Sequence, residues 1–180
     1  GAMSLAVGLS LRSSLSNLAS GILLIIFRPI KAGDFIQVGG AEGSVEEINI
    51  LFTELVTPSN QVLVVPNSNF MSNVITNYSS KVNRRCDITI GIGYNDPISK
   101  AKDVLQQLLD ADDRVLSLPE APLIAVNELA DSSVNILVRF WTSRSNFWVV
   151  KRELMEAIKC RFDEEGLSIP FPQLDVHVNQ

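Results

Sequence analysis

The sequence predicts an α+β fold in which an apolar N-terminal helix precedes a small β domain and a ferredoxin-like domain of helices and strands. The first observation is that residues 5–27 contain a single charged side chain, that of Arg12. The second is that strand-length runs separated by Gly, Asn and Pro follow Pro29. The third is that two helical periodicities alternate with strands beyond residue 81. A chain of 180 residues can bury a core in each domain.

Charge and hydropathy are distributed unevenly along the chain. The mean hydropathy is +0.20 and 46% of the residues are hydrophobic, which indicates one strongly apolar segment. Before residue 32 the chain carries Arg12, Arg28 and Lys31 but no acid, although its net charge is −5. An acidic body without a cluster of bases argues against a nucleic-acid partner.

The apolar segment at residues 5–27 has the length of a membrane-spanning helix. Its serines are too numerous for a helix that faces lipid on all sides, and small residues recur at helical spacing, which favours packing against identical helices. Leu5 and Leu9 are four positions apart, so in a ring of such helices they would form two apolar collars. A soluble amphipathic helix that buries its leucines in a core is the alternative. Arg28 and Lys31 indicate the cytoplasmic side of a membrane exit.

The β domain is expected to contain four or five short strands that close into a small, Sm-like barrel. Turn signals separate its runs at Gly39-Gly40, at Pro58-Ser59-Asn60 and at residues 66–69. The strand-length runs lie at residues 34–38, 43–57, 61–65 and 74–78.

The second domain reads as a βαββα succession of ferredoxin-like type, followed by a separate terminal strand. The helices are expected at residues 97–110 and 146–165, with Ile98 and Val149 among their buried side chains. The terminal strand alternates apolar and polar residues and is expected to pair between subunits. The strands are expected at residues 87–92, 123–128, 134–142 and 174–178.

Five parts of the chain follow from this succession of elements. Gly1-Ala2-Met3 has the sequence of a cleaved expression-tag remnant and is set aside. The parts are the tag remnant at 1–3, the membrane helix at 4–27, the β domain at 28–80, the α+β domain at 81–171 and the intersubunit strand at 172–180.

Catalytic and metal-binding patterns are absent from the sequence, so we expect no enzyme activity, no metal and no cofactor. The only histidine, His177, has no nucleophile or metal partner in a motif. Gly91-Ile92-Gly93 hints at a phosphate loop, but Asp96 stands where the third glycine of that fingerprint belongs. Cys86 and Cys160 lack the spacing of a metal or redox site, and we expect two buried thiols in a reducing compartment.

The run LAVGLSLRSSLSNLASGILLIIFRPIKAGDFIQVGG at residues 5–40 closely resembles the third membrane helix and β domain of the bacterial small-conductance mechanosensitive channel family. The resemblance continues through VLVVPNSNF at 62–70 and NELADSSVNILVRFW at 127–141 to PFPQLDVHV at 170–178. It implies a ring of seven subunits, each with three membrane helices, above a hollow cytoplasmic vestibule.

The resemblance also implies roles for single residues. Leu5 and Leu9 match the two leucines that seal the pore, and Gly21 matches a hinge glycine. Three positions depart from the family pattern: Arg12 replaces an uncharged glutamine at the pore mouth, Ser13 replaces the kink glycine, and Ser68 also replaces a glycine. The remaining matches are Ala6, Gly8 and Ser10 on the sliding helix faces, and Asn17 with Ser68 at the coupling between pore helix and β domain.

Two functions remain open at this point. The first is a channel subunit of the bacterial inner membrane, opened by membrane tension to release ions and small osmolytes in hypo-osmotic shock, with residues after about 28 in the cytoplasm. The second is a soluble oligomeric scaffold that binds RNA or protein. The acidic charge and the apolar first segment disfavour the scaffold.

Overall fold

The computed structural model describes the backbone of residues 1–174 and 176, and the side chains of residues 1, 8–174 and 176. The chain forms two compact units, residues 1–81 and the part that begins at Val82. Each unit has its own buried apolar cluster, so each is described by itself.

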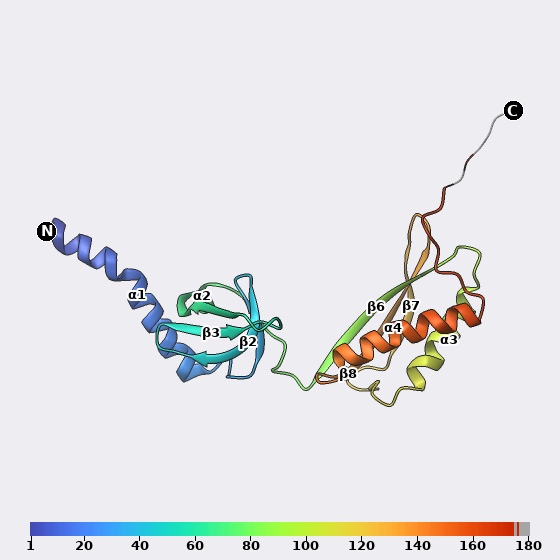
Figure 1. Cartoon of the computed structure of the whole chain (residues 1–180), viewed down its shortest axis with the longest axis horizontal. Helices are drawn as coiled ribbons and strands as arrows, with labels where there is room; N and C mark the ends of the chain where they lie inside the picture. The colour runs from blue at the N-terminus through green and yellow to red at the C-terminus, as the bar shows by residue number, and fades with distance from the viewer. Residues whose placement is uncertain (175, 177–180) are drawn as a thin grey trace. The chain divides into compact units, whose positions relative to one another are not determined.

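The first unit begins with α1, a continuous helix over Ala2–Phe27 that includes Ala2 and Met3 of the expected tag remnant (Figure 1). Within it, Gly8–Phe27 has a mean hydropathy of 1.4, which is long and apolar enough to cross a membrane by length and composition. The helix ends at Phe27. Its C-cap residue, Arg28, adopts the left-handed conformation, and the Arg28 N–H donates to the Leu24 carbonyl at 3.0 Å.

The five antiparallel strands of the first unit form one sheet in the order β4-β3-β2-β1-β5. Residues 43–57, expected as one run, form two strands joined by a tight turn in which the Asn49 N–H donates to the Phe52 carbonyl at 2.9 Å. The turn expected at residues 66–69 opens a short helix, α2. The elements are β1 Phe35–Val38, β2 Ala41–Ile48, β3 Phe52–Val56, β4 Val62–Pro66, α2 Asn67–Ser72 and β5 Ile75–Asn77.

The core of the first unit includes one side chain from α1. Leu24 is fully buried beside Ile36, Val38 and Leu55, which project from β1 and β3. At about 25 cal/mol per Å² of buried apolar area, a fully buried leucine stabilises the packing by roughly 2 kcal/mol. The end of α1 is therefore fixed to the β sheet by burial.

The second unit has the expected βαββα order, with a three-stranded antiparallel sheet in the order β6-β8-β7. Every second residue of β8 is buried, as expected of a strand with one face covered by helices. Figure 1 shows α4 running along this sheet. The elements are β6 Asn83–Ile92, α3 Ile98–Asp110, β7 Leu123–Leu129, β8 Val134–Ser143 and α4 Phe147–Glu164.

Three expectations about buried side chains in the second unit were wrong. Cys86 is buried, but Cys160 lies on the exposed face of α4. Val149 is 48% exposed, and its neighbour Val150 takes the core position. Ile98, in the first turn of α3, is 38% exposed.

The terminal segment lies only partly within the described residues. Leu174 and Val176 are exposed and belong to no strand of this chain. Residues 175 and 177–180, including His177, lie outside the described part. The pairing of this segment between subunits stays a prediction.

Candidate functional site

Helix α1 contacts the β domain at Gly21, where no side chain would fit. A Cβ atom built on Gly21 would lie 2.2 Å from the Ile50 carbonyl oxygen and 2.5 Å from the Asn67 Nδ2 atom. Real Cβ atoms do not approach backbone this closely, so glycine is required by the contact itself. Because α1 continues through Ser13 and Gly21 without interruption, the hinge role predicted for these two residues stays a prediction.

A buried polar network lies beneath this contact. Thr53 donates from its hydroxyl to Asn67 Oδ1 at 2.8 Å, and Asn67 Nδ2 donates to the Asn49 carbonyl at 2.9 Å. The Asn67 N–H donates to the Leu51 carbonyl at 3.1 Å. Thr53 and Asn67 are both fully buried. These hydrogen bonds tie the first residue of α2 to the β2–β3 turn. Their loss would leave buried polar groups without partners, which would destabilise the fold.

Asn17 of α1 caps helix α2 from a distance of 51 residues along the chain. The N-cap residue of α2 is Pro66, which has no side-chain acceptor for the free N–H groups of the first turn. Asn17 Oδ1 instead accepts a hydrogen bond from the Ser68 N–H at 2.9 Å. The structure therefore brings together the two residues expected to couple α1 to the β domain. Their part in gating stays a prediction.

In the N-terminal half of α1, the predicted pore residues whose side chains are described lie exposed on the surface of this chain. Leu9 is 61% exposed, and Arg12 and Ser13 are exposed as well. A Cβ atom on Gly8 would meet nothing within 4 Å, and Ser10 is also at the surface. The side chains of Leu5 and Ala6 lie outside the described ones.

The predicted membrane-exit bases lie beside an apolar pocket at the end of α1. Arg28 and Lys31 line it, and its volume is about 400 Å³. The Lys31 N–H donates to Asp34 Oδ2 at 3.1 Å, and neither basic side chain belongs to an ion pair identified among the described residues. The other lining residues are Leu24, Ile25, Ile30, Ala32 and Ile48.

In the second unit, Asp96 occupies the loop where the sequence hinted at phosphate binding. Its Oδ2 accepts hydrogen bonds from the Gly93 N–H at 3.0 Å, the Ser168 N–H at 2.8 Å and the Ser168 hydroxyl at 2.6 Å. Burial raises the pKa of the Asp96 carboxyl, but these hydrogen bonds outweigh it and the pKa is lowered. The carboxylate thus takes the donors that a phosphate would need.

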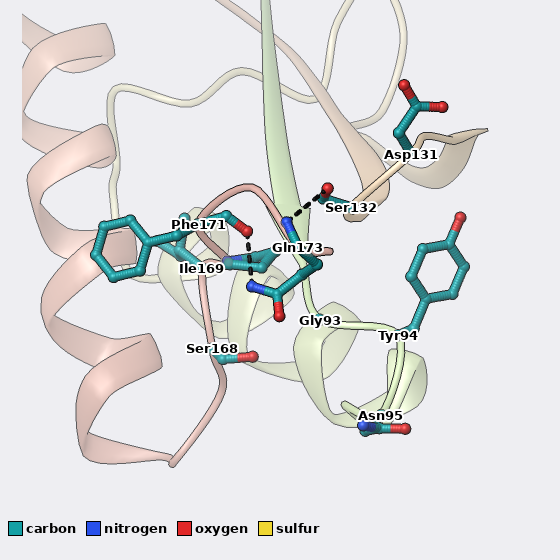
Figure 2. Close-up of a pocket in the computed structure, with 10 residues that line it drawn as sticks. Gly93, Tyr94, Asn95, Asp131, Ser132, Ser168, Ile169, Phe171 and Gln173 are labelled. Atoms are coloured by element: carbon teal, nitrogen blue, oxygen red, sulfur yellow. Dashed lines mark hydrogen bonds between the residues drawn. The ribbon is translucent and has the colours of Figure 1, made fainter. Parts of the chain in front are cut away.

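A cavity of about 760 Å³ lies beside Asp96. Figure 2 shows Tyr94 and Phe171 on opposite sides of it, with Gln173 between them. The Gln173 N–H donates to the Ser132 hydroxyl at 3.0 Å, so the segment after α4 is tied to the β7–β8 turn. Among the residues that the structure describes, no group of three or more His, Cys, Asp or Glu could hold a metal ion.

We call the contact of Gly21 and Asn17 with the β2–β3 turn and α2 the α1 junction. Sequence reasoning missed the β-domain residues that stabilise this junction. Thr53 and Asn49 carry no signal of their own, because a lone threonine or asparagine in a strand region is common. The proline directly before Asn-Ser-Asn did offer a signal, since it often precedes a helix start.

Two family models match the chain in succession. The model described as "Mechanosensitive ion channel, beta-domain" matches residues 13–80, and the one described as "Mechanosensitive ion channel MscS, C-terminal" matches residues 86–169. The first matches the α1 junction and β sheet, and the second matches most of the α+β unit.

Similar proteins agree with these models. An uncharacterized MscS family protein of Synechocystis sp. is 46% identical over 180 residues, which are 100% of this chain and 60% of the relative. The small-conductance mechanosensitive channel of Edwardsiella ictaluri is 43% identical over 179 residues, 99% of this chain and 62% of the relative. The chain therefore spans a little under two thirds of the length of these relatives.

A solved structure shares the fold of the whole chain. The closed-state crystal structure of Helicobacter pylori MscS superposes with a TM-score of 0.94 at 31% identity, covering 100% of this chain and 71% of that one. The fold class and the resemblance read from the sequence are confirmed by these matches, and the chain belongs to the MscS family of mechanosensitive ion channels.

Proposed function

We propose that this chain contains the pore-lining helix and cytoplasmic region of a channel subunit that opens under membrane tension. The observation that carries the proposal is the exposure of α1. Leu9, Leu11 and Leu15 are 61%, 58% and 65% exposed, although Leu24 at the far end is fully buried in the β domain. An apolar helix anchored at one end and uncovered at the other requires a membrane, further copies of itself, or both.

In the proposed assembly, seven subunits place their α1 helices side by side in the bacterial inner membrane. Small residues at Ala6, Gly8 and Ser10 allow close helix approach, and Leu5 and Leu9 of each subunit form apolar collars that exclude water and ions. Tension favours the state that occupies more bilayer area, so the collars separate and ions and small osmolytes leave during hypo-osmotic shock. Residues after about 28 are cytoplasmic in this arrangement.

The α1 junction supplies a route by which the β domain restrains the pore helix. Gly21 and Asn17 hold α1 against the β2–β3 turn and α2, eight to twelve positions beyond Leu9 along the same helix. A displacement of α1 that widens the pore would strain these contacts. This restraint is supported by the short distances between α1 and the β domain and by the burial of the residues at their contact.

Patch recording of the full-length protein, in membrane that lacks other mechanosensitive channels, tests the proposal. Suction should evoke currents, and Leu9→Ser should lower the pressure needed, because a polar collar no longer excludes water. Leu11→Ser is the matched control, since residue 11 is about 200° from residue 9 around the helix. Silence at lytic tension would contradict the proposal and favour a soluble scaffold. Equal effects of the two variants would contradict the leucine collar.

A further inference from the structure

We propose that the cavity beside Asp96 in the second unit binds an organic cation that carries an alkylated ammonium group. Its volume of about 760 Å³ lies within the roughly 300–1,000 Å³ typical of small-molecule sites. Its lining combines two aromatic side chains, Tyr94 and Phe171, with the carboxylate of Asp131. Asp131 is the only charged residue among those that line the cavity, so the lining has the sign that attracts a cation.

The two aromatic rings of the cavity are accessible to a ligand. Tyr94 is 56% exposed and Phe171 is 84% exposed, and Figure 2 shows them on opposite sides of the cavity. Within the part of the chain that the structure describes, neither ring stacks on another ring or lies under a cationic side chain. The face of an aromatic ring attracts a cation, and sites lined by several rings recognise quaternary ammonium groups. The two ring faces therefore suit a cation supplied by a ligand.

The Asp131 carboxylate provides the charge that a neutral aromatic site would lack. It is exposed and belongs to no ion pair found among the described residues. One carboxylate supplies too few oxygen ligands for a bare calcium or magnesium ion, which takes six or more. An alkylated ammonium group needs no such shell of ligands. The lining therefore favours an organic cation over a metal ion.

An anionic ligand does not fit this cavity. Neither lysine nor arginine is among the residues that line it. The Gly93 N–H and the Ser168 N–H, which could hold an anion, already donate to Asp96 Oδ2 at 3.0 and 2.8 Å. A phosphate or carboxylate ligand would meet Asp131 without a compensating base.

Hydrogen bonds hold both walls of the cavity in place. The Tyr94 hydroxyl donates to the Ala130 carbonyl at 2.6 Å, which fixes the ring against the β7–β8 turn. On the opposite wall, Gln173 Nε2 donates to the Phe171 carbonyl at 2.7 Å, and the Gln173 N–H donates to the Ser132 hydroxyl at 3.0 Å. A site whose walls are already held loses less conformational entropy when a ligand binds.

Ligand-observed NMR of the full-length protein in a maltoside detergent tests the site. The probes are choline and its uncharged isostere, in which a carbon atom replaces the nitrogen, and signals from protein-free micelles are subtracted. The wild type should bind choline with a Kd at least about five-fold lower than that of the isostere, because the ring faces and the carboxylate act on the charge.

Two substitutions separate the contributions of the carboxylate and the rings. Asp131→Asn keeps the shape of the side chain, and Phe171→Leu keeps an apolar side chain without a ring. Each should raise the Kd for choline about two- to five-fold and leave the Kd for the isostere nearly unchanged. Both residues are exposed, so the melting temperature should stay at its wild-type value.

The matched controls lie outside the cavity. Asp103→Asn removes an exposed carboxylate of α3, and Trp148→Leu removes an exposed aromatic ring of α4. Neither residue lines the cavity, so neither change should alter the Kd for choline.

Three outcomes would overturn the proposal. Equal affinity for choline and the isostere would assign the cavity to a neutral ligand. Choline binding that survives both Asp131→Asn and Phe171→Leu would place the cation elsewhere on the protein. Choline signals that never saturate would show that no site for the cation exists.

The cation site does not depend on the proposed channel activity, because its lining residues all belong to the second unit. Pressure-activated currents without choline binding would remove the cation site and leave the channel standing. Choline binding in a protein without currents would do the reverse.

Discussion

Asn17 on α1 accepts a hydrogen bond from the Ser68 N–H in the first turn of α2, and no residue of α2 or its cap performs this task. The two elements are therefore joined by a cap supplied from another helix. This arrangement makes the contact sensitive to the side chain at position 17 and insensitive to the one at position 68.

Asn17→Ala should reduce the free energy of unfolding by about 1 kcal/mol, because the Ser68 N–H loses its acceptor. Asn17→Asp keeps an acceptor and should recover most of the loss. Ser68→Ala is the control, since the bond uses the backbone of residue 68, and it should leave stability nearly unchanged. Chemical denaturation measures all three. Equal losses for Asn17→Ala and Ser68→Ala would contradict the cap.

Gly21→Ala should destabilise the first unit by roughly 1–3 kcal/mol, because the added Cβ would overlap the Ile50 carbonyl oxygen. Gly8→Ala, at a position with open space, should not disturb the α1 junction and favours helix by about 1 kcal/mol. The melting temperature from thermal unfolding distinguishes the two roles of Gly21, a close contact with the β domain and a hinge in α1. A hinge alone predicts altered gating kinetics in Gly21→Ala with an unchanged melting temperature.

Thr53→Val should cost about 1–3 kcal/mol, because it keeps the shape of the side chain but leaves the buried Asn67 Oδ1 without its donor. Thr76→Val, at an exposed position of β5, is the matched control and should change stability by less than about 0.5 kcal/mol. Denaturant midpoints provide the comparison. A loss in Thr76→Val equal to that in Thr53→Val would show that the network contributes nothing specific.

Acid should weaken the second unit through Asp87, which joins β6 to β8. The hydrogen bond from Arg139 lowers the pKa of the Asp87 carboxyl, burial opposes this, and Arg85 lowers it further. A lowered folded-state pKa gives stability that is present above the unfolded pKa of about 3.9 and is lost as pH falls through the folded value. Because the pair is partly exposed, we expect less than about 1 kcal/mol.

Asp87→Asn should flatten this part of the pH dependence of unfolding below about pH 4. Glu128→Gln, which removes an exposed carboxylate of β7, should not. Parallel profiles for Asp87→Asn and the wild type would rule out a contribution from Asp87.

Arg12→Gln should shift permeation of the full-length channel toward cations, because each subunit would lose one positive charge at the proposed pore mouth. Reversal potentials in asymmetric KCl measure the shift. Lys81→Gln, which removes an exposed charge from the end of the first unit, serves as the control. Identical reversal potentials for the wild type and Arg12→Gln would place Arg12 away from the ion path.

Most elements were predictable because their periodicities are strong, as in β8, where burial alternates at every residue. The β2–β3 turn was missed because Asn49, Ile50 and Leu51 interrupt a β-rich run without the Gly or Pro that marks a turn. Short helix α2 was read as a turn, since six residues carry too little periodicity to show a helix.

The residues of the candidate site also divide into those that the sequence predicted and those that it did not. Asn17 and Ser68 were named through the family resemblance, and the structure shows the bond between them. Thr53 and Asn49 act through contacts between distant strands, which no local pattern encodes. Val149 was wrongly assigned to the core: Val150 lies four positions before the buried Leu154 and continues the helical stripe, whereas Val149 lies five positions before it.

The cap borrowed from α1 has a consequence for how the junction can be observed. Buried Asn67 still ties the start of α2 to the β2–β3 turn when α1 withdraws, but the Ser68 N–H then loses its acceptor. The amide proton of Ser68 would then become free to exchange with deuterium. Its exchange rate under increasing membrane tension would count the separations of the two helices directly, including those that never lead to a conducting pore.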